Sequence, residues 1–212
     1  INIKKKQFNW RTRLLNDKRI IIPVNNDFKH WQFCYNYLWH NIGLSLVEKI
    51  LNDFYEPKYH YIDIGSNLGL RTLYSLSIKR PLICFEPNIE LHDFTTKIYS
   101  LNNFKKYKIE SLCMSDKKQN STFYISASTY MSSLNKNDAE NDKYGGMTKE
   151  IKVQSDSLDN YLYKNNHIEP KIIKIDAEGH DIEVLKGGMR TIEKYKPSII
   201  IEVNSLDLKK KS

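Results

Sequence analysis

Short apolar runs rich in β-branched residues alternate along the chain with segments in which apolar residues recur at helical spacing. Such a run is typical of a buried strand, and recurrence at every third or fourth residue is typical of a helix that packs on one side. The predicted strands cover residues 61–64, 82–85, 107–116, 171–176 and 197–204. This alternation favours an α/β fold, with a parallel sheet covered by helices on both faces.

Two helical stripes are expected to pack on this sheet. One precedes the first predicted strand and the other follows the strand at 171–176; their residues are Leu46, Val47, Ile50, Leu51 and Phe54, and Ile182, Leu185, Met189 and Ile192. Two further predicted strands, at 121–128 and 150–158, flank a polar, glycine-containing insert from Asn135 to Met147. The composition of that insert predicts a mobile loop.

A glycine turn, Gly65-Ser66-Asn67-Leu68-Gly69, connects the first strand to a helical pattern. Glycines let the backbone approach a ligand closely, and the start of a helix directs N–H groups toward it. The turn therefore predicts a ligand-binding site.

The polar residues that close each apolar run are informative, because ligands of an open parallel sheet bind beyond the carboxyl ends of its strands. In chain order these residues are Asp63 and Gly65, Glu86, Ser115 and Asp116, Asp176 and Glu178, and Glu202 and Asn204. Glu86 follows the glycine turn by roughly 20 residues, where an acidic residue accepts hydrogen bonds from the two ribose hydroxyls of a nucleoside. The turn and the acid together predict a nucleoside-type cofactor.

The spacing of the turn discriminates between such cofactors. It lacks the G-x-G-x-x-G pattern that seats a pyrophosphate on a helix N-terminus, and Asp63 just before it would repel a phosphate. An NAD-type oxidoreductase is therefore disfavoured. S-adenosylmethionine has no phosphate but carries an ammonium and a sulfonium, so Asp63 near its amino-acid end and Glu86 at its ribose form a coherent pair.

Four segments occur in a fixed order, YIDIGSNLGLRTL, CFEPN, SDSLDNYL and KIIKIDAEGHDIEVLKGG, followed by IIIEV. In this ordered set, over residues 59–204, the chain resembles the FkbM-type S-adenosylmethionine-dependent methyltransferases. The resemblance implies a Rossmann-like three-layer sandwich with a mostly parallel central sheet, and O-methylation, commonly of a sugar hydroxyl. The cofactor contacts that it implies, with their neighbours in the same motifs, are Asp63, Gly65, Ser66, Asn67, Gly69, Glu86, Pro87 and Asn88, with Ser115 and Asp116 near the adenine.

The chain departs from the family pattern in two places. His180-Asp181 stands where the family usually has a small residue and then Glu, so His180 is expected to be specific to this protein's substrate. The family fold normally continues with two strands after the fifth, whereas this sequence ends at Ser212. The sheet is therefore completed either outside this sequence or in a different way.

Methyl transfer to an alcohol needs an in-line approach in a site that excludes water, and a positioned base contributes about 10²- to 10⁴-fold. Asp176, which ends the fourth strand, is the first candidate for orienting or deprotonating the acceptor hydroxyl. His180 is the second, with an ordinary histidine at a helix start as the alternative. Lys174 lies on the same strand face as Asp176 and either keeps that carboxylate ionised or forms a structural ion pair.

Further acidic and hydroxyl side chains complete the predicted site. Glu178 and Glu202 would form an acidic cluster with Asp176, in which a divalent metal would polarise the hydroxyl. No histidine–carboxylate spacing calls for such a metal, and metal dependence is not expected. Tyr130, Ser132 and Glu202 are the candidates for lining the acceptor site.

The length of the chain limits the number of domains that it can form, and its charge limits the kinds of partner that it is expected to bind. Its 212 residues suffice for one substantial core, and we predict an N-terminal aromatic and basic extension, 1–40, followed by the methyltransferase domain, 41–212. Aromatic residues between Trp31 and Trp39 are expected either to pack or to form a flap over the substrate. The net charge is +8, but no basic stripe interleaved with aromatics predicts nucleic-acid binding.

Three cysteines without C-x-x-C spacing indicate a reducing compartment, and no apolar run has membrane-spanning length, so a cytoplasmic location is expected. The first residue is not Met, which leaves open that the chain is one domain of a larger glycan-modifying protein. The sequence thus predicts an S-adenosylmethionine-dependent O-methyltransferase with a sugar or glycan acceptor. The alternatives are a catalytically silent glycan-binding or scaffold module with the same core, and an NAD-type oxidoreductase.

Overall fold

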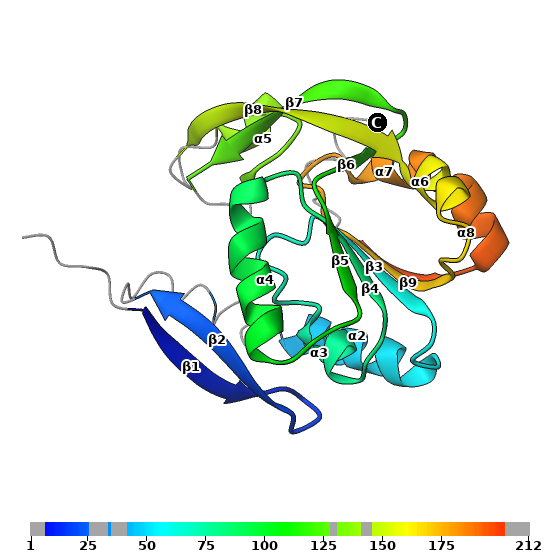
Figure 1. The fold of residues 1–212 in the computed structure, drawn as a ribbon. Helices are drawn as coiled ribbons and strands as arrows, with labels where there is room; N and C mark the ends of the chain where they lie inside the picture. Colours follow the sequence, from blue (N-terminus) through cyan, green and yellow to red (C-terminus); the bar gives the residue numbers. More distant parts are fainter. Residues whose placement is uncertain (1–6, 26–33, 35–41, 128–130, 141–145, 202–212) are drawn as a thin grey trace, which may run out of the picture.

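The computed structural model describes residues 7–25, 34, 42–127, 131–140 and 146–201. Its centre is a five-stranded parallel sheet with the spatial order β10-β9-β3-β4-β5. The strands are β3 (His60–Ile64), β4 (Leu82–Phe85), β5 (Tyr107–Glu110), β9 (Pro170–Ile175) and β10 (Ser198–Ile201). Helices cover both faces of the sheet (Figure 1), which confirms the predicted α/β, Rossmann-like three-layer architecture.

Alternation along the strands divides the core between the two faces. On the first face Tyr61, Leu82, Cys84 and Ile172 belong to one buried cluster. The residues that alternate with these point to the second face and belong to another buried cluster, which contains Ile62, Ile64, Ile83, Phe85, Ile173 and Ile175. Since both faces are covered, the strands read as continuous apolar runs in the sequence.

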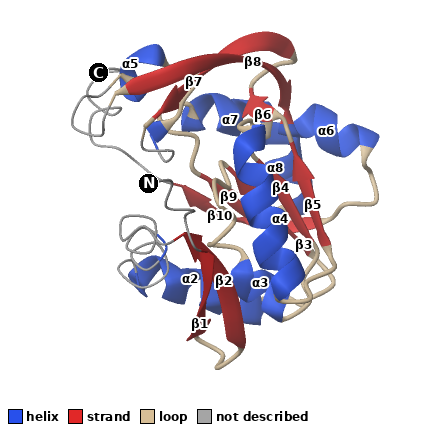
Figure 2. Cartoon of the chain, turned by 60° about the vertical axis from the view of Figure 1, so that its left-hand side comes forward, coloured by secondary structure: helices blue, strands red, loops and turns tan. Residues whose placement is uncertain are grey.

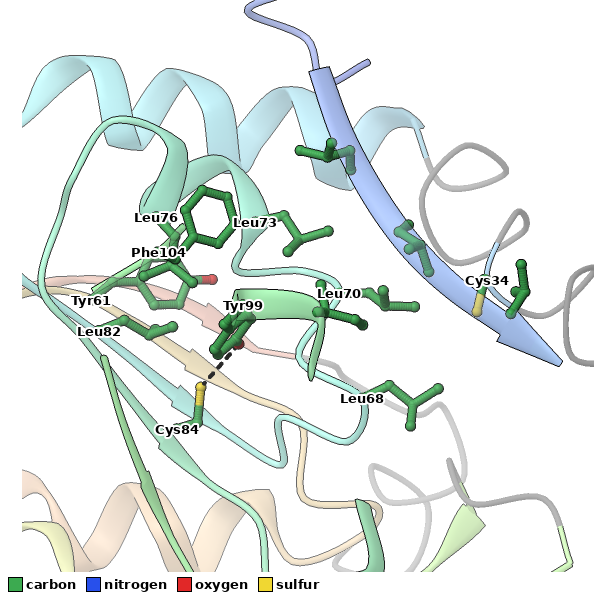
Figure 3. Close-up of a cluster of buried hydrophobic side chains, with 14 of the residues drawn as sticks. Cys34, Tyr61, Leu68, Leu70, Leu73, Leu76, Leu82, Cys84, Tyr99 and Phe104 are labelled. Atoms are coloured by element: carbon green, nitrogen blue, oxygen red, sulfur yellow. Dashed lines mark hydrogen bonds between the residues drawn. The ribbon is translucent and has the colours of Figure 1, made fainter. Parts of the chain in front are cut away.

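The first face is covered by α2 (Ile42–Phe54), α3 (Leu73–Ser77) and α4 (His92–Leu101). Figure 3 shows Tyr99 of α4 beside Cys84 of β4, with the tyrosine hydroxyl 3.6 Å from the sulfur. A short 3₁₀ turn, η2 (Ile89–Leu91), leads into α4. The first predicted helical stripe does form a helix, α2.

The orientation of α2, however, corrects the prediction for its apolar stripe. Leu46, Val47, Ile50 and Phe54 are exposed, and of the stripe only Leu51 packs against the core. The inward positions are polar instead, with Glu48 and Asn52 buried. The buried guanidinium of Arg80 explains this orientation, because it binds the Asn52 side chain and the last carbonyls of α2.

An antiparallel hairpin, β1 (Gln7–Arg13) and β2 (Arg19–Asn25), precedes these elements and packs on α4 (Figure 1). Ile20, Ile22 and Val24 of β2 are buried in the same cluster as the first face of the sheet. The hairpin lies within the predicted extension 1–40, whose boundary stays a prediction. The aromatic segment from Trp31 to Trp39 falls outside the described residues except for Cys34.

The second face is covered by α6 (Leu158–Lys164), α7 (Asp181–Gly187) and α8 (Met189–Tyr195). The second helical stripe was predicted as one helix, but the glycine pair 187–188 divides it into α7 and α8. Ile182 and Met189 are exposed, and Val184 is the buried apolar side chain of α7.

A second sheet, with the order β6-β8-β7, consists of β6 (Cys113–Ser115), β7 (Gln119–Ser126) and β8 (Met147–Ser157). The predicted single strand 107–116 is therefore wrong: it divides after Glu110 into β5 of the central sheet and β6 of the second. The reason is that β8 offers a parallel backbone partner to residues 113–115. Ser115 thus ends a strand of the second sheet.

Part of the predicted loop 135–147 is helical, and residues 141–145 of this insert lie outside the described residues. Lys136–Ala139 form a short helix, α5, whose first turn is capped because Asn135 Oδ1 accepts from the Asn137 N–H at 3.1 Å. Ser133 pairs with Tyr124 of β7 through two backbone hydrogen bonds. Figure 2 shows β7 and β8 as a long ribbon with α5 beside it.

Candidate active site

A cavity of about 650 Å³ lies where β3, β4 and β9 end, and residues of the second sheet form its opposite wall. The central sheet and its loops contribute Gly65, Glu86, Lys174 and Asp176, and the second sheet and the segment after β7 contribute Met114, Phe123, Ser132 and Leu134. This volume is typical of a small-molecule site, and its place agrees with the rule for open parallel sheets.

The glycine turn after β3 is packed tightly against the segment after β9. Gly65 has φ +74°, and a Cβ at this position would lie 1.8 Å from the carbonyl oxygen of Asp176. Gly69 has φ +65°, and its Cβ would lie 2.4 Å from the hydroxyl of Tyr99. Glycine at both positions is therefore a requirement of the backbone path, which brings Gly65 and Asn67 to the cavity wall.

The carboxylate of Glu86, directly after β4, is held by two backbone N–H groups. Asn67 N–H donates to Oε2 at 2.8 Å and Asn88 N–H donates to Oε1 at 2.9 Å. The side chain is 6% exposed, and burial raises its pKa to about 7 although both hydrogen bonds oppose that shift. Glu86 is thus fixed at the cavity wall with its remaining lone pairs available as acceptors.

An apolar wall lies next to Glu86, at the β4–β5 end of the cavity. It consists of Phe85, Pro87, Leu112 and Met114. A flat, weakly polar ring such as a nucleobase fits a surface of this kind.

The other predicted cofactor residues are not among those that line the cavity. They are Asp63, Ser66, Gly69, Asn88, Ser115 and Asp116. Asn88 caps η2 through its side chain, which accepts from the Glu90 N–H at 3.2 Å. Ser115 Oγ donates to Asp116 Oδ1 at 3.1 Å and lies 2.9 Å from His180 Nε2. Ser115 thus connects Asp116 to His180, which does line the cavity.

Lys174 connects two carboxylates on the first face of the sheet. Its Nζ lies 2.8 Å from Asp176 Oδ2 and 3.5 Å from Asp63 Oδ1, and the side chain is buried. Asp176 borders the cavity, as the strand alternation predicts, whereas Asp63 is fully buried and its pKa is raised by desolvation. Asp63 therefore does not border the cavity itself and is connected to it through its ion pair with Lys174.

Two residues near this group were missed by the sequence analysis. Glu48 of α2 is buried, which raises its pKa to about 7, and it accepts from the Tyr61 hydroxyl at 3.4 Å. Arg71 lines the cavity, and its Nη1 donates to Ser45 Oγ at 3.1 Å. In the sequence, each of these two residues is a charged position within an otherwise apolar helical pattern, and this is the signal that could have identified them.

The turn between β9 and α7 brings two more predicted residues to the cavity, Glu178 and His180. Glu178 has φ +45°, and its carbonyl accepts from Ser133 Oγ at 2.6 Å, which ties the turn to the second sheet. Burial lowers the pKa of His180, so the imidazole is held toward its neutral form.

Of the predicted acceptor residues, Ser132 lines the cavity, and its Oγ accepts from the Ser126 N–H at 3.1 Å. Tyr130 and Glu202 lie outside the described residues. Within the described ranges, no three His, Cys, Asp or Glu side chains are arranged to hold a metal ion. Among the helices that the structure describes, none has the length and apolar character needed to cross a membrane.

The comparison with known families agrees with this site. The family model of the methyltransferase FkbM domain matches residues 63–211, more than half of the chain, and this range contains most of the residues that line the cavity. Among curated proteins, none matches the chain. The chain belongs to the FkbM methyltransferase family.

Proposed function

We propose that the protein is an S-adenosylmethionine-dependent O-methyltransferase whose acceptor is a sugar hydroxyl in a glycan or glycosylated molecule. The observation that carries the cofactor assignment is Glu86, a carboxylate fixed at the cavity wall by the N–H groups of Asn67 and Asn88. Two ribose hydroxyls are suitable donors to such a group.

The rest of the cavity fits the same cofactor. The apolar wall of Phe85, Leu112 and Met114 suits an adenine, and the close packing of Gly65 on the Asp176 carbonyl brings the glycine turn and Asp176 together at the cavity wall. The carboxylate of Asp176 at the cavity wall disfavours a pyrophosphate, which counts against NAD. The bound cofactor would supply an electrophilic methyl group.

The acceptor assignment rests on the polar groups at the other end of the cavity. Asp176, Glu178 and His180 offer hydrogen-bond acceptors at the cavity wall, and Ser132, in the segment after β7, lines the same cavity. A polyhydroxy substrate offers matching donors. In this proposal Asp176 orients or deprotonates the reacting hydroxyl, Lys174 keeps Asp176 ionised, and His180 contacts the acceptor.

The cofactor assignment is tested by calorimetric titration with S-adenosylhomocysteine and, separately, with NAD. Wild-type protein is expected to bind only the former. Glu86→Gln should weaken that binding about 10- to 100-fold, because the amide has one acceptor oxygen where the carboxyl group has two, so a hydrogen bond to the ribose is lost. Glu110→Gln is the matched control: this carboxylate ends the neighbouring strand β5, pairs with Lys108 and Tyr161, and does not line the cavity.

Equal affinity of Glu86→Gln and wild type would contradict the ribose role of Glu86. Binding of NAD in place of S-adenosylhomocysteine would favour an oxidoreductase. A protein that binds S-adenosylhomocysteine but methylates no member of a sugar panel would favour a catalytically silent glycan-binding module.

We also propose a cytoplasmic location. Cys34, Cys84 and Cys113 are free and buried, and burial raises the pKa of each thiol, so they serve as small apolar core residues. Such free thiols are typical of a reducing compartment. Fractionation of the cells that produce the protein would test this directly.

A further inference from the structure

Arg71 is a buried cation at the wall of the cavity. Its side chain is 8% exposed, and the bond from Nη1 to Ser45 Oγ at 3.1 Å fixes it from the side of α2. Arg71 follows the glycine turn by two residues and lines the same cavity as Gly65 and Asn67. A buried guanidinium beside a cavity presents a rigid fork of donors, which matches a carboxylate or a phosphate.

The other charges around the cavity make Arg71 the place for an anionic group. Asp176 and Glu178 line the cavity and repel anions, and Glu86, whose pKa burial raises to about 7, adds to this repulsion in its ionised fraction. The second buried cation, Lys174, is shared between the carboxylates of Asp176 and Asp63 and is balanced by them.

Two acidic residues, Glu48 of α2 and Asp63 of β3, interact electrostatically with Arg71, and Glu48 offsets its charge only in part. Burial raises the pKa of Glu48 to about 7, so a neutral solution leaves a large fraction of this carboxyl protonated. Glu48 therefore cancels only part of the positive potential that Arg71 contributes at the cavity wall.

The order of strands separates Arg71 from the base end of the cavity. Phe85 and Leu112 lie toward β4 and β5, whereas Leu44 of α2 and Ile200 of β10 line the cavity at the opposite end. The bond to Ser45 places Arg71 at this α2 end. A nucleoside with its ribose at Glu86 and its base against Phe85 directs its 5′ substituent toward Arg71.

We propose that Arg71 binds the carboxylate of the amino-acid end of the cofactor. The inference rests on the proposed function, because it takes the ligand to be S-adenosylmethionine or its product. Among the cavity-lining groups described above, Arg71 attracts this carboxylate, whereas the carboxylates of Asp176 and Glu178 repel it. Asp63, which lies behind Lys174, then contributes by holding Lys174 in place.

The test compares two ligands in calorimetric titrations. S-adenosylhomocysteine has the carboxylate, whereas S-adenosyl-3-thiopropylamine keeps the adenosine, sulfur and ammonium groups and lacks it. Wild type should prefer the first by about 10- to 100-fold. Arg71→Met should lose that preference while binding the decarboxylated ligand as wild type does. Arg190→Met, the control, removes an arginine whose side chain is 81% exposed and should keep the preference.

Three outcomes would overturn the proposal. Arg71→Met that keeps the preference would show that the carboxylate binds elsewhere. An equal loss of affinity for both ligands would make Arg71 a structural support of the cavity. Equal binding of both ligands by wild type would mean that no carboxylate subsite exists, with the cofactor assignment intact. Wild type that binds neither ligand would instead refute the proposed function itself.

Discussion

At the scale of residues, three charged side chains of alternating sign lie next to one another near the carboxyl end of the sheet. Asp63 on β3 and Asp176 after β9 flank the ammonium of Lys174. Parallel pairing of β3 with β9 brings Asp63 opposite Lys174, so the contact exists only because these two strands are neighbours. The arrangement supports the view that Asp176 is kept ionised at the edge of the cavity.

Asp176→Asn should therefore retain cofactor binding and lose turnover. The amide still accepts from Lys174 but cannot take a proton, and loss of a positioned base costs about 10²- to 10⁴-fold in rate. The measurement is transfer of labelled methyl from S-adenosylmethionine to a panel of sugars, together with titration of S-adenosylhomocysteine. Asp93→Asn, at an exposed position of α4, is the control. Turnover equal to that of wild type would remove Asp176 as the base.

At the scale of elements, α2 is attached to the sheet mainly by polar contacts at its C-terminal end. The fully buried guanidinium of Arg80 donates five hydrogen bonds of 2.7 to 3.0 Å, and their acceptors are Asn52 Oδ1 and the carbonyls of Asn52, Tyr55, Glu56 and Tyr59. These include carbonyls that a helix end leaves without intrahelical partners. The positive charge also complements the helix dipole.

Arg80→Met should lower the free energy of unfolding by about 3 kcal/mol or more, because several buried acceptors lose their donor at once. Arg80→Lys should recover only part of this loss, since an ammonium cannot reproduce the planar fork. Urea unfolding measures both. The exposed Arg190→Met should change stability by less than about 1 kcal/mol. A loss for Arg80→Met as small as that of the control would contradict the capping role.

At the scale of the whole molecule, the free energy of unfolding depends on the protonation of Glu48, a carboxyl group buried between α2 and the sheet. Glu48 has a pKa of about 7 in the folded protein, above its value in an unfolded chain. Between these two values the folded state binds more protons than the unfolded state. The contribution of Glu48 is thus fully present at low pH and is lost as the pH rises through 7.

Glu48→Gln should abolish this loss, because the amide has the shape of the protonated carboxyl and does not ionise. The variant is expected to match wild type near pH 4.5 and to exceed its free energy of unfolding by about 3 kcal/mol at pH 8. Urea unfolding at the two pH values provides the measurement. Glu56→Gln, at an exposed position, should behave as wild type at both. A difference between Glu48→Gln and wild type that does not change with pH would refute the assignment.

The cavity is also a property of the whole molecule, because two sheets form it. Ser133 Oγ donates to the carbonyl of Glu178, so the segment after β7 holds the turn that presents Glu178 and His180. The sequence predicted both turns and most of the strands, yet it joined β5 and β6 into one strand. The error arose because strand pairing with β8, which lies about forty residues later, is not visible in a local pattern.

The sequence by itself determined the parallel α/β sheet, the glycine turn and the positions of Glu86, Lys174 and Asp176, because strand alternation and turn chemistry are local. Only the tertiary structure decided which charges meet. The meeting of Arg71 with Ser45, the burial of Glu48 and the sharing of Lys174 depend on the orientation of α2 and on the pairing of β3 with β9. These contacts join residues far apart in the chain, where packing and burial, not local pattern, set the energies.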